Sequence, residues 1–177
     1  MRVYLAATVP LLARLERDGV LEPTVAPGAS GGSGASAAPG YAVTASLRSW
    51  YAEGDEEELE YAALTAAARG SLRLLADQPE APRRRVVVAA DVPDARVAVP
   101  AGPEGADPGV IEITGPVRLV DVASLHLDEV AAEQAVAAAA EALAAADKGD
   151  GDAAFTVEAV EDYDLLWYAV QELADLV

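Results

Sequence analysis

The chain has 177 residues, 53% hydrophobic and 24% charged, and its 12 Lys and Arg against 30 Asp and Glu give a formal net charge of −18. This length fits one domain with a substantial core, and the apolar fraction is too high for an intrinsically disordered acidic protein. Because so negative a chain repels phosphates, we expect no nucleic-acid partner and no attachment to an anionic membrane surface.

The chain contains no cysteine, which excludes disulfides, thiolate nucleophiles and cysteine-ligated metal centres. The N-terminal residues lack the sustained apolar run of a signal peptide. No segment approaches the roughly 20 uninterrupted apolar residues that a membrane span needs. We therefore expect a cytoplasmic protein.

The N-terminal part predicts a strand, a helix and a long loop. Residues 2–7 are typical of a strand, and residues 8–19 are typical of a helix with Pro10 in its first turn and Gly19 at its end. Residues 23–40 are rich in Gly, Ser, Ala and Pro and predict a flexible loop. A lid over a site is the alternative, but this segment offers no aromatic or charged side chain that would contact a ligand.

The next segments predict a short strand at 41–43 and two helices. Thr44 is placed to cap a helix that carries Leu47, Trp50 and Tyr51. Asp55 and Glu58 have capping-box spacing and open a longer helix that reaches about residue 77. Apolar side chains recur along this helix at spacings of three and four and predict a buried stripe: Tyr61, Leu64, Ala68, Leu72 and Leu75.

The second half of the chain predicts three strands and two helices. The apolar run 86–90 indicates a central strand covered on both faces, and residues 110–114 and 124–128 predict two more. Asp128 is placed to cap an Ala-rich helix that ends near residue 146. A final helix is predicted from about residue 162, with an apolar side that carries Leu165, Leu166, Ala169, Leu173 and Leu176.

This order of elements predicts one α/β domain over residues 1–177, with a mixed sheet of about five strands flanked by helices. The first three strands are separated by helices, so parallel pairing is open to them. An α+β, ferredoxin-like arrangement of two layers is the alternative.

Three residues are candidates for catalysis: Asp91, His126 and Asp128, with Asp121 as a further carboxylate. Asp91 and Asp128 each follow an apolar strand, and the carboxyl ends of parallel strands meet at one edge of a sheet. Together with His126 they could bind a divalent cation or carry out acid–base chemistry. We favour the structural alternative, in which Asp128 caps a helix, Asp91 begins a turn and His126 lies on a partly solvated sheet face. No complete ligand motif is present, so we assign no metal and no cofactor.

Two aromatic pairs are candidates for binding: Trp50 with Tyr51, and Trp167 with Tyr168. Amphipathic aromatic side chains often anchor interfaces. The alternative, which we favour, is that each Trp fills the core beside the leucines of its own helix.

Segments 1–12, 50–63, 86–95, 119–128 and 165–173 together resemble a small actinobacterial protein family that is uncharacterised. The resemblance covers nearly the whole chain apart from the Gly/Ser/Ala loop. It implies a cytoplasmic, single-domain protein, and it transfers no catalytic residue because the family has no assigned activity.

The sequence leaves two functions open. The first is a non-enzymatic acidic module that binds a protein partner or regulates it, for which the charge and the lack of a catalytic motif argue. The second is a small metal-assisted or acid–base enzyme that uses Asp91, His126 and Asp128. Nothing in the sequence predicts the oligomeric state.

Overall fold

The centre of the fold is an antiparallel sheet of seven strands, in the order β5-β6-β3-β1-β4-β8-β9. The structure, a computed structural model, describes residues 1–22, 37–51, 53–100 and 107–177. The strands of this sheet are β1 (Arg2–Ala7), β3 (Ala37–Tyr41), β4 (Val86–Asp91), β5 (Val97–Ala98), β6 (Val110–Thr114), β8 (Val122–Asp128) and β9 (Leu165–Tyr168). The short strands β2 (Val20–Leu21) and β7 (Val117–Arg118) pair separately.

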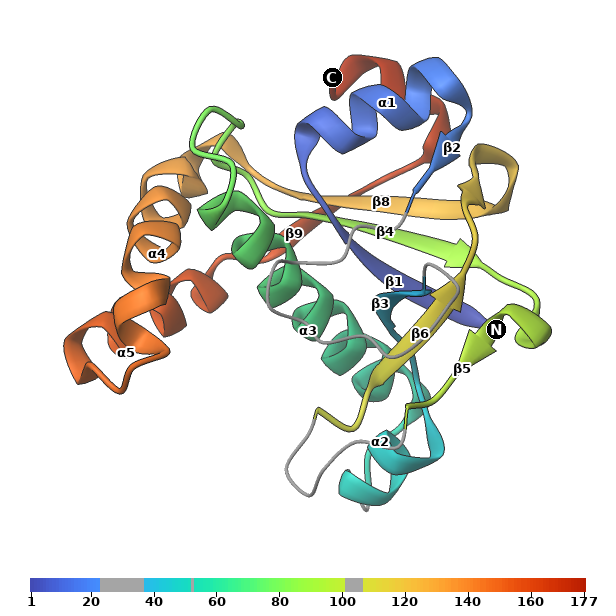
Figure 1. Ribbon diagram of the computed structural model, residues 1–177, viewed down its shortest axis with the longest axis horizontal. Helices are drawn as coiled ribbons and strands as arrows, with labels where there is room; N and C mark the ends of the chain where they lie inside the picture. The colour runs from blue at the N-terminus through green and yellow to red at the C-terminus, as the bar shows by residue number, and fades with distance from the viewer. Residues whose placement is uncertain (23–36, 52, 101–106) are drawn as a thin grey trace.

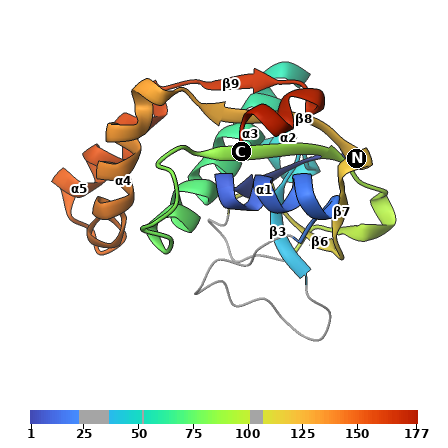
Figure 2. The same cartoon turned by 90° about the horizontal axis from the view of Figure 1, so that it is seen from above.

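Helices cover both faces of the sheet (Figure 1). The α-helices are α1 (Val9–Asp18), α2 (Ala45–Trp50), α3 (Glu56–Ala76), α4 (Glu133–Ala146) and α5 (Gly151–Glu158). Short 3₁₀ turns are η1 (Asp94–Arg96), η2 (Leu119–Asp121), η3 (Val130–Ala132), η4 (Ala159–Asp162) and η5 (Val170–Asp175). Seen from above, α4 and α5 lie beyond one end of the sheet (Figure 2). Among the described residues, no helix combines the length and the apolar character that a membrane span requires.

The two faces of β4 explain the two helical layers. Val86, Val88 and Ala90 belong to the core under α1, whereas Val87 and Ala89 belong to the core under α3. Successive side chains of a strand point to opposite faces, so a continuous apolar run requires a cover on each side. The predicted central strand is confirmed.

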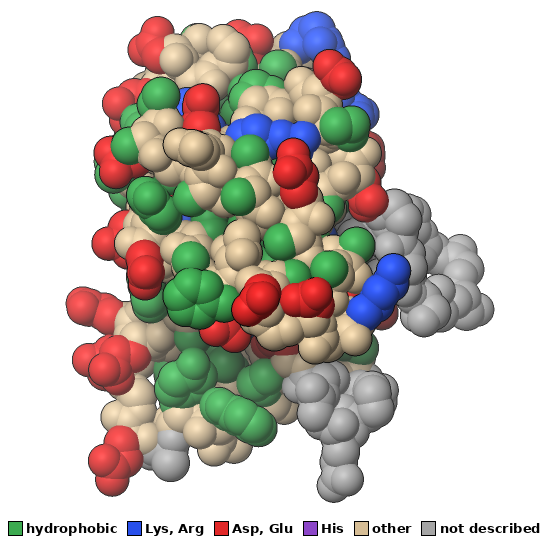
Figure 3. All heavy atoms as spheres, turned by 90° about the vertical axis from the view of Figure 1, so that its left-hand side faces the viewer, with side chains coloured by type: hydrophobic (Ala, Val, Ile, Leu, Met, Phe, Trp, Pro, Cys, Tyr) green, Lys and Arg blue, Asp and Glu red, His purple; other side chains and the backbone are tan. Residues whose placement is uncertain are grey.

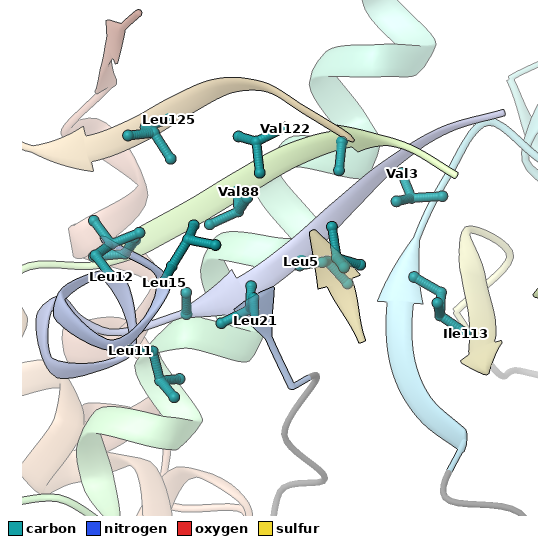
Figure 4. Close-up of a cluster of buried hydrophobic side chains, with 14 of the residues drawn as sticks. Val3, Leu5, Leu11, Leu12, Leu15, Leu21, Val88, Ile113, Val122 and Leu125 are labelled. Atoms are coloured by element: carbon teal, nitrogen blue, oxygen red, sulfur yellow. The ribbon is translucent and has the colours of Figure 1, made fainter. Parts of the chain in front are cut away.

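Helix α1 closes the upper face with three leucines. Leu12 and Leu15 point toward Val88 and Leu125 of the sheet, and Leu11 belongs to the same main core cluster (Figure 4). The C-terminal turn η5 packs beside α1 and adds Leu173 to the same cluster. Each buried leucine contributes about 1.5–3 kcal/mol to stability.

Helix α3 has a capped start, and near its end it is bonded to the opposite face of the sheet. Asp55 accepts a hydrogen bond from the Glu58 amide, and Glu58 accepts one from the Asp55 amide, so the predicted capping box is confirmed. Near the other end of α3, the buried Ser71 hydroxyl donates to the Ala7 carbonyl and accepts from the Val86 amide. Ser71 therefore joins α3 to β1 and β4.

The predicted single α/β domain with a helix-flanked sheet is confirmed, and the two-layer alternative is wrong because α1 and α3 lie on opposite faces. Parallel pairing is also wrong, since every strand pair among the described residues is antiparallel. The connection through α3 leaves from β3 and enters β4, but β1 lies between these strands in the sheet.

The C-terminal part differs most from the prediction. Residues 165–168 form strand β9 and residues 170–175 form a 3₁₀ turn, where a single helix was expected. The short apolar run fits the residue spacing of a helix as well as that of a strand. It forms a strand because it pairs with β8. The Ala-rich helix begins at Glu133, so Asp128 does not cap it, and Asp150 caps the additional helix α5.

The predicted loop 23–40 is only partly described. Residues 23–36 lie outside the described residues. Residues 37–40 belong to β3 and pair with β6, so the strand begins earlier than Tyr41.

Candidate functional site

The three candidate catalytic residues do not converge. Strands β4 and β8 are antiparallel, with Val86 opposite Leu127 and Ala90 opposite Val122. Asp91 ends β4 and Asp128 ends β8, so the two carboxylates lie at opposite ends of the strand pair. The hypothesis that Asp91, His126 and Asp128 meet in one site is wrong because it required parallel strands.

Asp91 is an exposed partner of a neighbouring arginine. Its carboxylate accepts two hydrogen bonds from the Arg2 guanidinium, at 2.9 and 3.1 Å. The hydrogen bond from Arg2 holds the pKa of Asp91 below its ordinary value. Asp121 pairs with Arg118 in the same bidentate way. Both carboxylates are therefore engaged in ion pairs at the surface.

Asp128 is buried and has a structural role. It accepts hydrogen bonds from the backbone amide of Arg85 at 2.7 Å and from two guanidinium nitrogens of Arg85, at 2.9 and 2.7 Å. Arg85 also donates to the Tyr163 carbonyl at 2.7 Å. This ion pair joins β4, β8 and the segment before β9, and it engages both carboxylate oxygens of Asp128.

His126 and Ser124 are neighbours on the α3 face of β8. The Ser124 hydroxyl lies 3.0 Å from Nε2 of His126. Burial lowers the pKa of His126, and the positive charge of Arg2 lowers it further, so the imidazole is neutral at pH 7. Among the described residues no carboxylate is hydrogen-bonded to this imidazole, and no group of three ligating side chains is placed to hold a metal ion. The pair therefore lacks the third group that orients the base in a catalytic triad.

Three of the four candidate aromatic residues are exposed. The exposed fractions are 73% for Trp50, 44% for Tyr51 and 61% for Trp167, whereas Tyr168 packs against the main core. Our interpretation of both Trp residues as core is wrong. Trp50 and Tyr51 lie at the end of α2, and Trp167 lies on β9 opposite His126.

A groove separates α3 from the edge of the sheet. Two adjoining hollows of about 300 and 360 Å³ share four lining residues: Tyr61, Leu64, His126 and Trp167. We call the groove formed by these two hollows the Tyr61 groove. Tyr61 and Leu64 come from α3, His126 comes from β8 and Trp167 comes from β9. The Tyr61 hydroxyl donates to Asp164 at 3.3 Å and so links α3 to the segment that leads into β9.

A wider hollow lies on the outer side of α3. It measures about 910 Å³ and is lined by Tyr51, Tyr61 and the glutamates Glu53, Glu57 and Glu58, among others. Tyr61, which is 57% exposed, lines this hollow as well as the Tyr61 groove. The exposed aromatic side chains Tyr51, Tyr61 and Trp167 therefore border one continuous surface.

The charges of this surface are acidic. Glu57 and Glu60 line the groove and form no salt bridge with the described residues. Two nearby basic side chains already form ion pairs with other carboxylates, since Arg2 pairs with Asp91 and Arg69 pairs with Glu161. Burial, together with the negative charge of Glu60, raises the pKa of Tyr4 to about 12, so this lining residue stays a neutral phenol.

The face seen in Figure 3 is the side of the molecule on which α4 and α5 lie. Acidic side chains line its left margin, and large hydrophobic side chains gather near its lower end, at the height of α2 and the start of α3.

Sequence reasoning missed Tyr61, Glu57 and Glu60 as site residues. Glu57 and Tyr61 are four residues apart on α3 and so share one face, and that spacing was the available signal.

The model of a family described as "Family of unknown function (DUF6912)" matches residues 1–177. Neither a curated protein nor a solved structure matches the chain. The match over the full sequence agrees with the resemblance to an uncharacterised family, and the chain accordingly belongs to DUF6912, a family of unknown function.

Proposed function

We propose that this protein is a non-enzymatic, acidic interaction module that binds a basic segment of a partner protein, and regulates that partner, in the cytoplasm. The observation that carries the proposal is the exposure of Tyr51, Tyr61 and Trp167 around adjoining hollows whose free charges are carboxylates. The proposed binding surface consists of the Tyr61 groove and the outer hollow.

Exposed aromatic side chains favour binding over a purely structural role. Each such ring leaves apolar area in water that a partner would bury, and aromatic residues supply much of the binding energy at protein interfaces. Trp50, with 73% of its surface exposed, is the last residue of α2 and precedes Tyr51. The rings lie on or beside α2, α3 and β9, elements that the core holds in place.

The carboxylates indicate the chemistry of the partner. Glu57 and Glu60 lie in the groove and form no salt bridge with a described residue, since Arg2, which lines the same hollow, pairs with Asp91; the whole chain carries a charge of −18. Lys and Arg side chains can interact with the carboxylates and with the aromatic faces at the same time. The long-range field attracts a basic segment and repels nucleic acid and anionic lipid, so we propose neither of these as a partner.

The enzymatic alternative has less support. It required Asp91, His126 and Asp128 in one site, and the antiparallel register separates the two carboxylates. Both are engaged by arginines, Asp91 at the surface and Asp128 in the core. We therefore do not propose catalysis by these three residues.

A labelled peptide of alternating Lys and Val tests the proposal, with alternating Glu and Val as the control peptide. We expect fluorescence anisotropy to show that the basic peptide binds and the acidic one does not. The double variant Glu57→Gln/Glu60→Gln should weaken binding about five- to tenfold, since each exposed ion pair contributes up to about 1 kcal/mol.

The matched control is Glu133→Gln/Glu141→Gln, which removes the same charge from α4, away from the groove. This variant should bind the basic peptide within about twofold of the unmodified protein. An equal loss in both double variants would show that only the net charge attracts the peptide. No binding of the basic peptide at low salt would also contradict the proposal.

A further inference from the structure

Strand β9 is an open edge of the sheet. Within the described residues it pairs with β8 alone, in the register Leu165 opposite Asp128 to Tyr168 opposite Leu125. An edge strand presents unpaired backbone N–H and C=O groups along its free side. Proteins usually protect such edges with Lys, Pro, bulges or a covering element. The sequence of β9, Leu-Leu-Trp-Tyr, contains neither Lys nor Pro.

The side chains of β9 are also exposed. Leu166 is 44% exposed and Trp167 is 61% exposed, in a chain whose other large apolar residues are mostly in the core. Trp167 lies on the α3 face with His126, and Leu166 lies on the opposite face. The edge therefore combines a free backbone with apolar side chains on both faces.

The charges beside β9 differ between its two faces. On the α3 face, Glu57, Glu60 and Asp164 line the hollows that Trp167 borders. None of the three forms a salt bridge with a described residue. On the other face, Leu166 shares its side of the strand with Tyr168, which packs against the main core. A strand beside β9 would meet carboxylates on one face and apolar side chains on the other.

We propose, building on the function proposed above, that the partner supplies an extended segment that pairs with β9 as an eighth strand, with basic residues alternating with apolar ones. Its basic side chains point into the Tyr61 groove toward Glu57 and Glu60. Its apolar side chains cover Leu166. Backbone hydrogen bonds to β9 hold the segment, and the groove selects the side chains.

The charge of the chain favours a basic segment over a second copy of the chain as the partner of β9. Pairing of β9 with β9 of another copy would bring two chains of charge −18 together and place Asp164 and Glu60 of each near the other. Like charges across an interface oppose association. A basic segment gains from the same field, so the structure favours a heterologous partner.

The test uses the Lys/Val peptide with N-methyl groups on alternate residues. The backbone groups of a strand point to its two edges in alternation, so methylating one set blocks the edge that faces β9 and methylating the other set does not. We expect one methylated peptide to bind at least about tenfold more weakly than the parent and the other to stay within about threefold. Equal effects of the two sets, large or small, would overturn strand pairing.

Two further results separate this inference from the proposed function. If the methylated peptides bind alike but Glu57→Gln/Glu60→Gln still weakens binding, the acidic module stands and strand pairing falls. If the parent peptide does not bind at all, both proposals fail. Sedimentation equilibrium tests whether a second copy of the chain pairs with β9. A dimer of the free protein that is dissociated by the variant Trp167→Asp would show such pairing and would overturn the inference.

Discussion

Asp91 and Asp128 follow similar apolar strands in the sequence, yet they occupy opposite environments. Asp91 is exposed and pairs with Arg2 at the surface. Asp128 has no exposed surface and is enclosed by Arg85. Residue type and sequence position could not separate these roles, because the difference comes from the strand register and from Arg85, which precedes β4.

Removal of the two carboxylates should therefore have unequal costs. Asp128→Ala leaves the Arg85 charge buried without its partner and should lower the free energy of unfolding by about 3–5 kcal/mol. Asp91→Ala removes an exposed ion pair and should cost about 0–1 kcal/mol. Urea unfolding followed by circular dichroism measures both changes, and costs of similar size would contradict the assigned environments.

His126 should make stability depend on pH between neutrality and mild acid. Its pKa is lowered in the folded protein from an ordinary value of 6.5, so the unfolded chain takes up the proton first. The contribution of His126 is fully present above pH 6.5 and is lost as the pH falls from there through the folded pKa. The pKa values of the ion-paired carboxylates Asp91 and Glu161 are also lowered. Their contribution to stability is lost only below about pH 4.5, where the unfolded chain takes up their protons first.

Urea unfolding at about pH 7.5 and about pH 5.5 tests this dependence. We expect the free energy of unfolding to fall more steeply for the unmodified protein than for His126→Gln, which cannot take up the proton. Equal slopes for the two proteins in this range would show that His126 has the same pKa in the folded and unfolded states.

At the scale of elements, α3 approaches the sheet closely because Gly70 has no side chain. A Cβ atom at this position would lie 2.9 Å from the Cβ of Ala6 on β1, a distance that neither residue can relieve by a side-chain rotation. Ser71, the next residue, bridges β1 and β4 through its hydroxyl. Gly70 and Ser71 together fix the position of α3 relative to the strands, and hence the position of the Tyr61 groove.

Gly70→Ala should destabilise the protein although alanine favours helices. The gain in helix propensity is about 1 kcal/mol, and overpacking costs about 1–3 kcal/mol. We expect a net loss on the order of 1 kcal/mol in thermal or urea unfolding. Gly151→Ala is the matched control, because Gly151 is also helical and a Cβ atom added there would meet no atom within 4 Å. It should be neutral or stabilising, and a gain in stability for Gly70→Ala would contradict the close approach.

The predictability of the elements follows from the strength of their local signals. The start of α3 and the central strand β4 were predictable because a capping box and a long β-branched run each have one structural interpretation. Residues 165–176 were not, since a short apolar run fits a strand or a helix, and pairing with β8 is a long-range contact. The groove depends on that pairing, and this is why Trp167 was predictable as a candidate but its environment was not.

At the scale of the whole molecule, the charge of −18 is divided among different roles. Glu58 and Asp150 cap helices, and Asp147 pairs with Arg73 between α4 and α3. Asp128 supports the core. The carboxylates at the Tyr61 groove, Glu57 and Glu60, form no salt bridge with a described residue.

The salt dependence and the location of binding both follow from this distribution. Because exposed charges are screened within about 10 Å at 0.1 M salt, binding of a basic peptide should weaken as salt is added, while the apolar contacts of Trp167 and Leu166 persist. A purely electrostatic attraction would spread over the acidic surface and leave no preferred site.

Amide hydrogen exchange of the unmodified protein, with and without the Lys/Val peptide, tests the central claim most directly. We expect slower exchange at the amides of β9 on addition of the peptide, and smaller changes confined to the first half of α3 and the second half of β8, which pairs with β9. Protection spread evenly over the acidic helices α4 and α5, or absent from β9, would contradict the account.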